Sequence, residues 1–436
     1  MFYPAQILAL VFILSITIGA CLFKLPISHK EPITWLDAFF TATSATTSTG
    51  LMTVFNGDAF TPFGNIILLI LIQIGGLGVM TFATLIFLLI DRPISMKQRI
   101  MMQEALNQSS LGGILKLVRR LLIFSLLFEG VFTLVLAIRF IPQLGFWRGF
   151  IYAGFNAVSA FNNAGVTLWP DNLIRYVHDP IVNFAICALI ILGGIGFTVL
   201  NDIWDKKKWR EFGLHTKLML IGTVVINIIA FLIIFAIEFN NGKTIGHMDI
   251  GHKGLAAFFQ TITSRSAGFS TVDIGLLEPA TQFFMMMLMF IGAGSVSTGG
   301  GIKLSTFICL MAMVIAYIRR QNEPVFMERT IPRADIFKAL AITLIGGTII
   351  FIGLFLLLLT ENGSLSFSQL TFEAVSAFGT VGLSTGITAQ LSAAGQIVLA
   401  LMMIFGKLGP LTVMFALARD RGHDAIRYPR GKLFIG

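Results

Sequence analysis

Four glycines recur along the chain, and the residues before each of them are similar. Gly50, Gly165, Gly268 and Gly382 are 115, 103 and 114 residues apart, and each follows a Phe by ten residues. Small and hydroxyl-bearing residues fill most of each interval. Glycine lets the backbone take conformations that a side chain forbids, and rings of carbonyl oxygens can replace the water shell of a potassium ion. The pattern therefore predicts coordination of a dehydrated cation by the backbone.

The candidate ion-binding residues are the four glycines and the three residues that precede each of them. They are Thr47, Ser48, Thr49 and Gly50; Asn162, Asn163, Ala164 and Gly165; Arg265, Ser266, Ala267 and Gly268; and Gly379, Thr380, Val381 and Gly382. We expect their carbonyl oxygens to hold K+, so the side chains can differ between the four copies.

A glycine-rich run at 292–303 is the second candidate site. Five glycines in twelve residues disfavour a regular helix, since each costs about 1 kcal/mol relative to Ala. The run lacks the order of a phosphate-binding loop, because Ile302 separates Gly301 from Lys303. We expect a helix break that could obstruct a pore. The candidate gate residues are Gly292, Gly294, Ser295, Ser297, Thr298, Gly299, Gly300, Gly301, Lys303 and Lys407.

Ionisable residues inside apolar surroundings need partners, because an unpaired charge there is expensive. Lys407 is expected to clamp carbonyls of the glycine-rich run or to act as a cation barrier; the alternative is that it reaches toward the cytoplasm. Glu373 either attracts cations near the outer pore or pairs with a buried base such as Arg265. Glu129 is expected to make a polar contact in the protein interior, with a partner that the sequence does not identify.

The composition indicates which elements must position these residues. Hydrophobic residues make up 56% of the 436 residues and charged residues 12%, against about 25% charged in a soluble domain. This excludes a soluble enzyme and argues against nucleic acid as a partner. A membrane-spanning helix needs about 20 apolar residues. Eight such segments are expected, near 5–25, 63–90, 121–141, 180–200, 217–238, 280–318, 336–359 and 394–418.

The spacing of the glycines places one of them between the two spans of each successive pair. A short apolar stretch that cannot cross the bilayer precedes each glycine, such as the helix expected at 35–46. The predicted fold is an all-α integral membrane protein with four parallel span–re-entrant pore helix–span repeats, pseudo-fourfold around a central ion pore. The expected divisions are 1–100, 101–210, 211–325 with a gating loop at 291–303, 326–418, and a cytoplasmic tail at 419–436.

The distribution of basic residues predicts the orientation. The segments 91–120, 201–217, 319–338 and 419–436 contain 6, 5, 5 and 5 of the 31 Lys and Arg residues. Because cytoplasmic loops are enriched in Lys and Arg, both termini are expected in the cytoplasm. The densest basic run, at 206–210, is read as an orientation signal that also contacts anionic membrane lipid.

Three motifs resemble those of the Ktr/Trk/HKT superfamily of potassium transporters, and most closely the membrane subunit of bacterial Ktr systems. They are the stretches 155–165, 292–303 and 372–386. The resemblance implies potassium uptake across the bacterial cell membrane through a four-loop selectivity filter with an intramembrane gate at the glycine-rich run. It also implies a homodimer and a separate cytosolic ring of nucleotide-binding regulatory subunits. Glycine at all four filter positions resembles the potassium-selective pattern, and sodium as an activator remains open.

Other classes of function are weighed against this one. The first alternative is a sodium-coupled secondary cation carrier with alternating access, although parallel fourfold repeats argue against rocking halves. An intramembrane enzyme is disfavoured, because the sequence has no His-Glu-x-x-His motif. We therefore expect a transporter and not an enzyme.

Overall fold

The computed structural model is helical and describes residues 4–54, 59–78, 114–321, 323–361, 363 and 365–409. Its main helices are α1 (Pro4–Phe23), α2 (Trp35–Thr46), α4 (Pro62–Leu77), α7 (Ile114–Leu144), α8 (Phe146–Phe161), α9 (Pro180–Gly194), α10 (Phe197–Asp205), α11 (Leu214–Glu238), α12 (Ile250–Thr263), α13 (Pro279–Ile291), α14 (Leu304–Ile318), α15 (Arg333–Thr360), α16 (Phe367–Gly379) and α17 (Ala393–Leu408). The 3-10 turns are η1 (Ile174–Tyr176), η2 (Trp209–Glu211), η3 (Ile274–Leu276) and η4 (Thr388–Gln390), and the strands β1 (Val325–Phe326) and β2 (Arg329–Thr330) form one hairpin.

Local sequence signals determine where the short helices begin. Thr34 and Asp37 form a capping box at the start of α2, and Ser366 and Gln369 form another at the start of α16. Such a box satisfies backbone N–H groups that have no partner within the first helical turn. Asp249 caps α12 by accepting from two backbone N–H groups. The start of each of these helices is therefore determined by local side chains.

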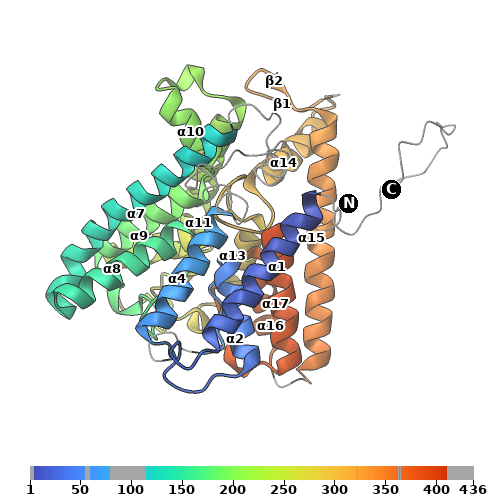
Figure 1. Ribbon diagram of the computed structural model, residues 1–436. Coiled ribbons are helices and arrows are strands. Elements are labelled where there is room, and N and C mark those ends of the chain that lie inside the picture. Colours follow the sequence, from blue (N-terminus) through green and yellow to red (C-terminus); the bar gives the residue numbers. More distant parts are fainter. Residues whose placement is uncertain are drawn as a thin grey trace.

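The helices group into four chain-sequential units, each with a short helix of 12 to 16 residues between two other helices. The short helices α2, α8, α12 and α16 each pack against the helix that precedes them. The last helix of one unit then packs on the short helix of the next: α4 on α8, α9 on α12, α13 on α16, and α17 on α2. Because the fourth unit contacts the first, the units close a ring, in which α2 and α16 lie at the opposite end from α10 and the β1–β2 hairpin (Figure 1).

Each unit has its own buried apolar cluster. One cluster joins α1, α2 and α4, and a second joins α7, α8 and α9. A third joins α11, α12 and α13, and a fourth joins α15, α16 and α17. Phe40 of α2 belongs to the fourth cluster, where the first and last units meet. The ring is therefore held by apolar packing within the units and between them.

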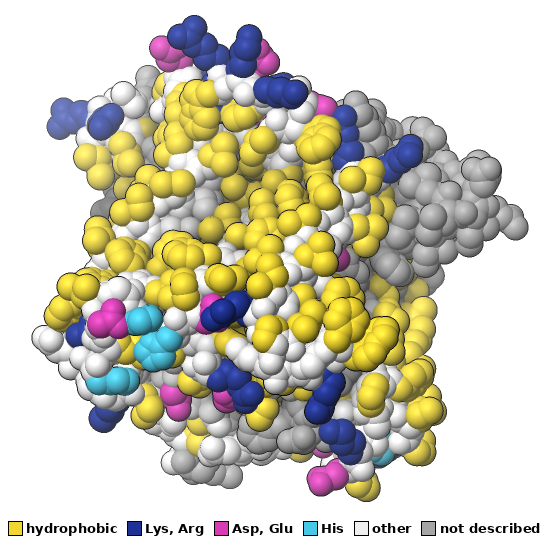
Figure 2. All heavy atoms as spheres, turned by 90° about the vertical axis from the view of Figure 1, so that its left-hand side faces the viewer, with side chains coloured by type: hydrophobic (Ala, Val, Ile, Leu, Met, Phe, Trp, Pro, Cys, Tyr) yellow, Lys and Arg dark blue, Asp and Glu magenta, His cyan; other side chains and the backbone are white. Residues whose placement is uncertain are grey.

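The outer faces of the long helices are apolar. On α11 the exposed side chains include Val224, Ile228 and Leu232. Figure 2 shows a band of hydrophobic side chains across one face, with charged side chains above and below it. Exposed apolar surface of this extent is incompatible with water and indicates a membrane protein.

Three helices of the described chain are long and apolar enough to cross a membrane. They lie within Leu117–Leu144, Leu214–Glu238 and Arg333–Thr360. The pair α9 and α10 adds a fourth if it counts as one span, but the two helices meet at 91°. The sequence analysis expected one segment at 180–200. The bend lies at residues 195–196, directly after Gly193 and Gly194, and Gly196 has a φ of +108°.

Some expected segments extend beyond the described residues. α4 ends at Leu77 and α17 at Leu408, so the ends of the second and eighth expected spans lie outside the described residues. The same holds for most of the basic segment 91–120 and for the whole tail at 419–436. The segment expected at 280–318 is two helices, α13 and α14, separated by non-helical residues at 292–303.

Candidate functional site

The four recurring glycines meet in a closed ring. A Cβ atom built on each of them would lie within about 2.5 Å of a carbonyl oxygen in the next segment: Ala164 for Gly50 (2.1 Å), Ala267 for Gly165 (2.5 Å), Val381 for Gly268 (2.4 Å) and Thr49 for Gly382 (1.8 Å). Each of these oxygens belongs to the residue just before the next glycine, and the fourth contact returns to the first segment. Real Cβ atoms essentially never approach so closely, so only glycine fits the ring.

The backbone has the same conformation in all four segments. The ring glycines have φ values of +94°, +66°, +77° and +88° in chain order. Two residues before each glycine, a buried polar residue also has a positive φ: Ser48 (+50°), Asn163 (+53°), Ser266 (+77°) and Thr380 (+47°). A non-glycine residue in this region carries about 1–3 kcal/mol of strain. The surrounding structure must therefore hold these four residues, which we call the inner ring.

Serines of the short helices support three of the four segments. The N–H of Gly50 donates to Ser44 Oγ (2.9 Å), and the N–H of Gly382 donates to Ser376 Oγ (3.1 Å). Ser159 Oγ accepts instead from the N–H of Val166, the residue after Gly165 (3.0 Å). The short helices end at these segments, so their C-terminal partial negative charge favours a cation there.

On the other side of the ring, where the chain continues beyond the glycines, a polar residue of each of three short helices holds the segment that leaves the ring. We call this the outer side. Asp37 of α2 accepts from Thr53 Oγ1 (2.8 Å), and Gln260 of α12 donates to Thr271 Oγ1 (3.4 Å). Glu373 of α16 is fully buried and accepts from Thr388 Oγ1 (3.0 Å). Thr53 and Thr271 each lie three residues beyond a ring glycine, which is a regularity that the aligned repeats could have revealed.

Glu373 does not pair with Arg265, as one sequence-based alternative had it. The Glu373 carboxylate accepts from Ser384 Oγ (2.5 Å) and from the N–H of Thr385 (3.1 Å). The Arg265 guanidinium donates to Asn227 Oδ1 (3.2 Å) and to the carbonyl of Gly292 (3.5 Å). Arg265 therefore points from the ring toward α11 and the first residue of the glycine-rich run.

Glu129 lies behind the second segment, and the structure identifies its partners. Its Oε1 accepts from Ser125 Oγ (2.6 Å), Gln73 Nε2 (3.0 Å) and Asn162 Nδ2 (3.3 Å). Asn162 also donates to Gln73 Oε1 (2.7 Å). The carboxylate thus links α4 and α7 to the residue three positions before Gly165.

Asn172 is a residue that sequence reasoning missed. Its Nδ2 lies 3.4 Å from the carbonyl oxygen of Gly165 and 3.5 Å from that of Gly268, while its Oδ1 accepts from the N–H of Ser270 (3.1 Å). One amide therefore joins two neighbouring glycine segments on their outer side. The loop that carries it has no counterpart in the glycine pattern, and only an unusual φ of +54° distinguishes Asn172.

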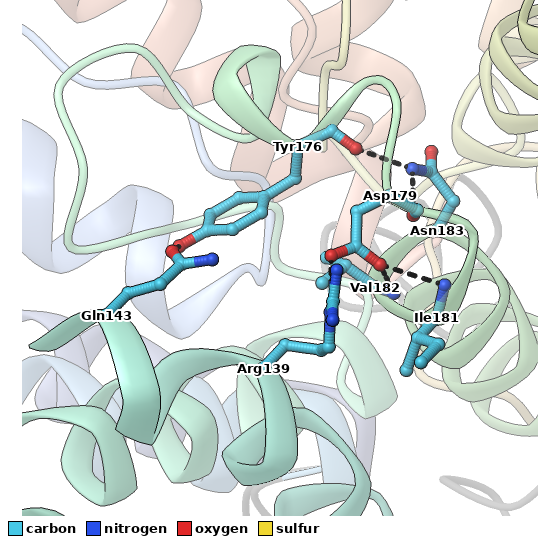
Figure 3. Close-up of polar contacts among 7 residues, drawn as sticks. All are labelled: Arg139, Gln143, Tyr176, Asp179, Ile181, Val182 and Asn183. Carbon is cyan, nitrogen blue, oxygen red and sulfur yellow. Dashed lines mark hydrogen bonds and ion pairs between the residues drawn. The ribbon is translucent and has the colours of Figure 1, made fainter. Parts of the chain in front are cut away.

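The loop that bears Asn172 is held against α7 by a polar cluster (Figure 3). Arg139 Nε donates to Asp179 Oδ2 (2.6 Å), and Tyr176 OH donates to Gln143 Oε1 (2.8 Å). Asn183 of α9 donates to the carbonyls of Tyr176 and Asp179, both at 2.7 Å. These contacts fix the end of the loop that leads into α9 relative to α7 and α9.

The glycine-rich run at 292–303 lies against the inner ring. A Cβ on Gly299 would meet Ser266 Oγ at 2.7 Å, and one on Gly300 would meet Thr380 Oγ1 at 2.3 Å. Thr298 Oγ1 donates to the carbonyl of Phe161 at the end of α8 (3.3 Å). The run therefore touches residues of the second, third and fourth units. It lies on the side of the ring formed by the residues that come before the glycines in the sequence.

Two lysines hold carbonyls of this run. Lys407 Nζ donates to the carbonyl of Thr298 (2.5 Å), and Lys303 Nζ donates to the carbonyl of Gly299. Lys407 belongs to α17, so it reaches the run from the fourth unit. The N–H of Gly301 donates to the carbonyl of Gly406 beside it (3.2 Å). Lys407 thus makes the carbonyl contact that one sequence-based interpretation assigned to it.

Comparisons with known proteins show the family of the chain. A family model described as TrkH, cation transport protein, matches residues 5–424. The chain is 49% identical over 435 residues to the Ktr system potassium uptake protein B of Bacillus subtilis (strain 168). The aligned region covers 100% of this chain and 97% of that protein. It is 39% identical over 435 residues to the Ktr system potassium uptake protein B of Vibrio alginolyticus, covering 99% and 94% of the two chains.

A solved structure has a similar fold. The crystal structure of the potassium transporter TrkH from Vibrio parahaemolyticus superposes with a TM-score of 0.77 at 17% identity, covering 95% of this chain and 84% of that one. At this identity the likeness concerns the fold. The resemblance expected from the sequence motifs is confirmed by these comparisons.

Proposed function

The chain belongs to the TrkH family of cation transport proteins, and from this membership we propose that it takes up potassium ions across the cell membrane through a central pore. The family consists of transporters and not of enzymes. Both relatives named above are called potassium uptake proteins, and they match nearly the whole chain. Potassium is in this proposal the transported ion, and not a cofactor.

One observation carries the proposal: the closed ring of four glycines, each packed on a carbonyl of the next segment. The segments 47–50, 162–165, 265–268 and 379–382 are the proposed selectivity filter, and their carbonyl oxygens are the proposed K+ ligands. Carbonyl oxygens replace the hydration shell of the ion. Four short helices direct their C-terminal partial charge at the same point, which stabilises a cation further. Irregular backbone at membrane depth is tolerated where it lines such a pathway.

The proposed architecture has eight spans in four parallel repeats. Each unit contributes a first helix, a re-entrant short helix, a filter segment and a second helix. Packing of α17 on α2 supports this arrangement, since it joins the last unit to the first. The proposed repeat boundaries are 1–100, 101–210, 211–325 and 326–418. Both termini are proposed to lie in the cytoplasm, as the basic loops indicate.

The run at 292–303 is the proposed gate. It lies against the inner ring, and two lysine ammonium groups sit on its carbonyls. In this position the run obstructs the path of an ion that has passed the filter. The gate residues are those named from the sequence, from Gly292 to Lys303 together with Lys407. Deletion of 294–301 should raise potassium flux, and unchanged flux would remove the gate assignment.

The proposed assembly is a homodimer in the bacterial cell membrane, with a cytosolic ring of nucleotide-binding subunits as regulator and sodium as a candidate activator. Relatives named as parts of a Ktr system support a multi-component assembly. The basic run at 206–210 is proposed to contact anionic membrane lipid.

Rescue of a potassium-uptake-deficient bacterium tests the function. Cells expressing the chain, with and without a co-expressed regulator and at several sodium concentrations, are expected to grow at low external potassium. Failure to grow under every condition would overturn the proposal. Potassium accumulation against its own gradient, driven by an imposed sodium gradient, would favour the sodium-coupled carrier, whereas flux that only follows the potassium gradient, at equal sodium on both sides, favours the pore.

A further inference from the structure

The hydroxyl of Ser266 is shared between the proposed gate and the proposed filter. The N–H of Gly300 donates to Ser266 Oγ (3.2 Å). The same hydroxyl lies within donating distance of the carbonyls of Thr380 (3.2 Å) and Gly379 (3.3 Å). Ser266 is fully buried. One side chain of the third unit thus connects the gate run to the fourth filter segment.

The other serine of the inner ring has no such contact. Ser48 holds the matching position in the first unit and also has a positive φ. Its Oγ is buried and has no hydrogen-bond partner within the described residues. The gate run touches Ser266 and Thr380 at close range. Two serines in the same conformation at the same ring position therefore differ in their contact with the gate.

The chemistry of a hydroxyl explains how contact with the gate run can affect the carbonyls of the filter. A serine hydroxyl has one proton and accepts through its lone pairs. When the Gly300 N–H occupies a lone pair, the proton is left to point at an acceptor, and the nearest acceptors are the carbonyls of Gly379 and Thr380. A donor bound to a hydroxyl also polarises it and strengthens the bond that it donates. A carbonyl that accepts such a bond is a poorer ligand for a cation.

We propose that Ser266 is the positioning residue that couples the gate to the filter. The inference rests on the proposed function. With the run in place, the Ser266 proton caps a carbonyl at the inner end of the filter while the run obstructs the path. When the run withdraws, the hydroxyl oxygen and that carbonyl both become available to a potassium ion. Gate closure therefore removes an ion ligand as well as blocking the pathway.

The test compares Ser266→Ala with Ser48→Ala in the purified full chain. Both substitutions remove a hydroxyl from the same ring position, but only Ser266→Ala also removes the bond from Gly300 and the contacts with the carbonyls of Gly379 and Thr380. The ratio of the two fluxes reports the sum of these contacts. We expect potassium efflux from proteoliposomes without regulator to be about fivefold higher for Ser266→Ala than for Ser48→Ala, since one hydrogen bond of about 1 kcal/mol corresponds to that factor. A ratio of one would overturn the coupling.

A second comparison separates coupling from a structural role. In a chain that lacks 294–301, the ratio between the two alanine variants should fall, because the bond from Gly300 no longer exists and only the contacts with Gly379 and Thr380 remain; an unchanged ratio would overturn the proposal. If the deleted chain does not fold, Lys407→Met replaces the deletion, and the ratio should shrink in that background. Ser266→Gly, which accepts a φ of +77° without strain, should reproduce the alanine result. Absence of any potassium flux in the wild-type chain would instead overturn the proposed function.

Discussion

At the scale of single residues, the absence of a side chain at the ring glycines decides how closely the four segments meet. Gly382 is the tightest of them, because a Cβ there would lie 1.8 Å from the carbonyl oxygen of Thr49. The oxygen in question belongs to the proposed filter, so it cannot move without changing the ion site. A substitution at this glycine acts directly on the geometry of coordination.

We predict that Gly382→Ser weakens discrimination of potassium over sodium. The new Cβ forces the first and fourth segments apart, and a strain of about 1–3 kcal/mol corresponds to a loss of selectivity on the order of tenfold. Competition of sodium with potassium uptake in cells measures the effect.

Gly386→Ser is the matched control for this substitution. Gly386 has nearly the same φ, +89° against +88°, but apart from its chain neighbours no atom of the described residues lies within 4 Å of its Cβ position. Backbone strain is therefore common to both variants, and only Gly382→Ser adds the clash. Equal selectivity in the two variants would contradict the role of close packing in the ring.

A second residue-scale prediction concerns Glu129. Replacement by Ala leaves the donors of Ser125, Gln73 and Asn162 without their common acceptor. Unsatisfied buried donors cost about 1–3 kcal/mol, so we expect Glu129→Ala to lower the free energy of unfolding and the unfolding temperature in detergent. Leu126→Ala, on the exposed face of the same helix, is the control. Similar unfolding temperatures in both variants would show that the cluster has no stabilising effect.

At the scale of elements, glycines in the second helix of three units allow that helix to approach the end of the short helix. A Cβ on Gly75 would lie 2.0 Å from the carbonyl of Thr46, and one on Gly193 or Gly406 would lie 1.8 Å from the carbonyl of Phe161 or Phe378. The third unit differs, since α13 ends at Ile291 and the gate run takes its place. Close approach in the first, second and fourth units and a helix break in the third give the ring its asymmetry.

Two glycine-to-alanine substitutions should have opposite signs. In a helix interior alanine is favoured over glycine by about 1 kcal/mol. Among the residues that the structure describes, none comes within 4 Å of the Cβ position of Gly347 in α15, so Gly347→Ala is expected to raise the unfolding temperature. Gly193→Ala of α9 is expected to lower it, because the clash outweighs the gain in helix propensity. Thermal unfolding followed by circular dichroism measures both, and a stabilised Gly193→Ala would refute the close approach.

At the scale of the whole molecule, we expect the chain to be oriented so that its basic loops face the cytoplasm. The segments 201–217 and 239–249 flank α11 and would lie on opposite sides of the membrane. Lys207 and Gly242 are exposed residues in these two segments. They therefore offer a direct measurement of orientation.

We predict opposite labelling of two introduced cysteines, each in a chain whose three native cysteines, Cys21, Cys187 and Cys309, are replaced. A membrane-impermeant maleimide added to intact cells should label Gly242→Cys and leave Lys207→Cys unlabelled. Inverted membrane vesicles should give the reverse pattern. Labelling of both positions from the same side would contradict the topology.

The sequence by itself determined much of the local structure. The helix expected at 35–46 is α2, since its capping residues and apolar positions are local signals. The interruption of the sixth apolar segment followed from its glycine content, and the structure confirms it between Ile291 and Leu304. The repeat of Phe and Gly identified the segments that meet in the ring, because the same backbone conformation requires glycine at the same place in each copy.

Only the tertiary structure decided which segments touch and through which atoms. Glu129 has partners on different helices, and Asn172 joins two segments from a third loop. Whether Glu373 meets Arg265 likewise depends on how different helices pack. The difference between Ser48 and Ser266 is of the same kind, since both serines lie in similar local sequence. Spacing along a chain encodes backbone conformation, which is local, whereas these contacts depend on how the four units pack against one another in the ring.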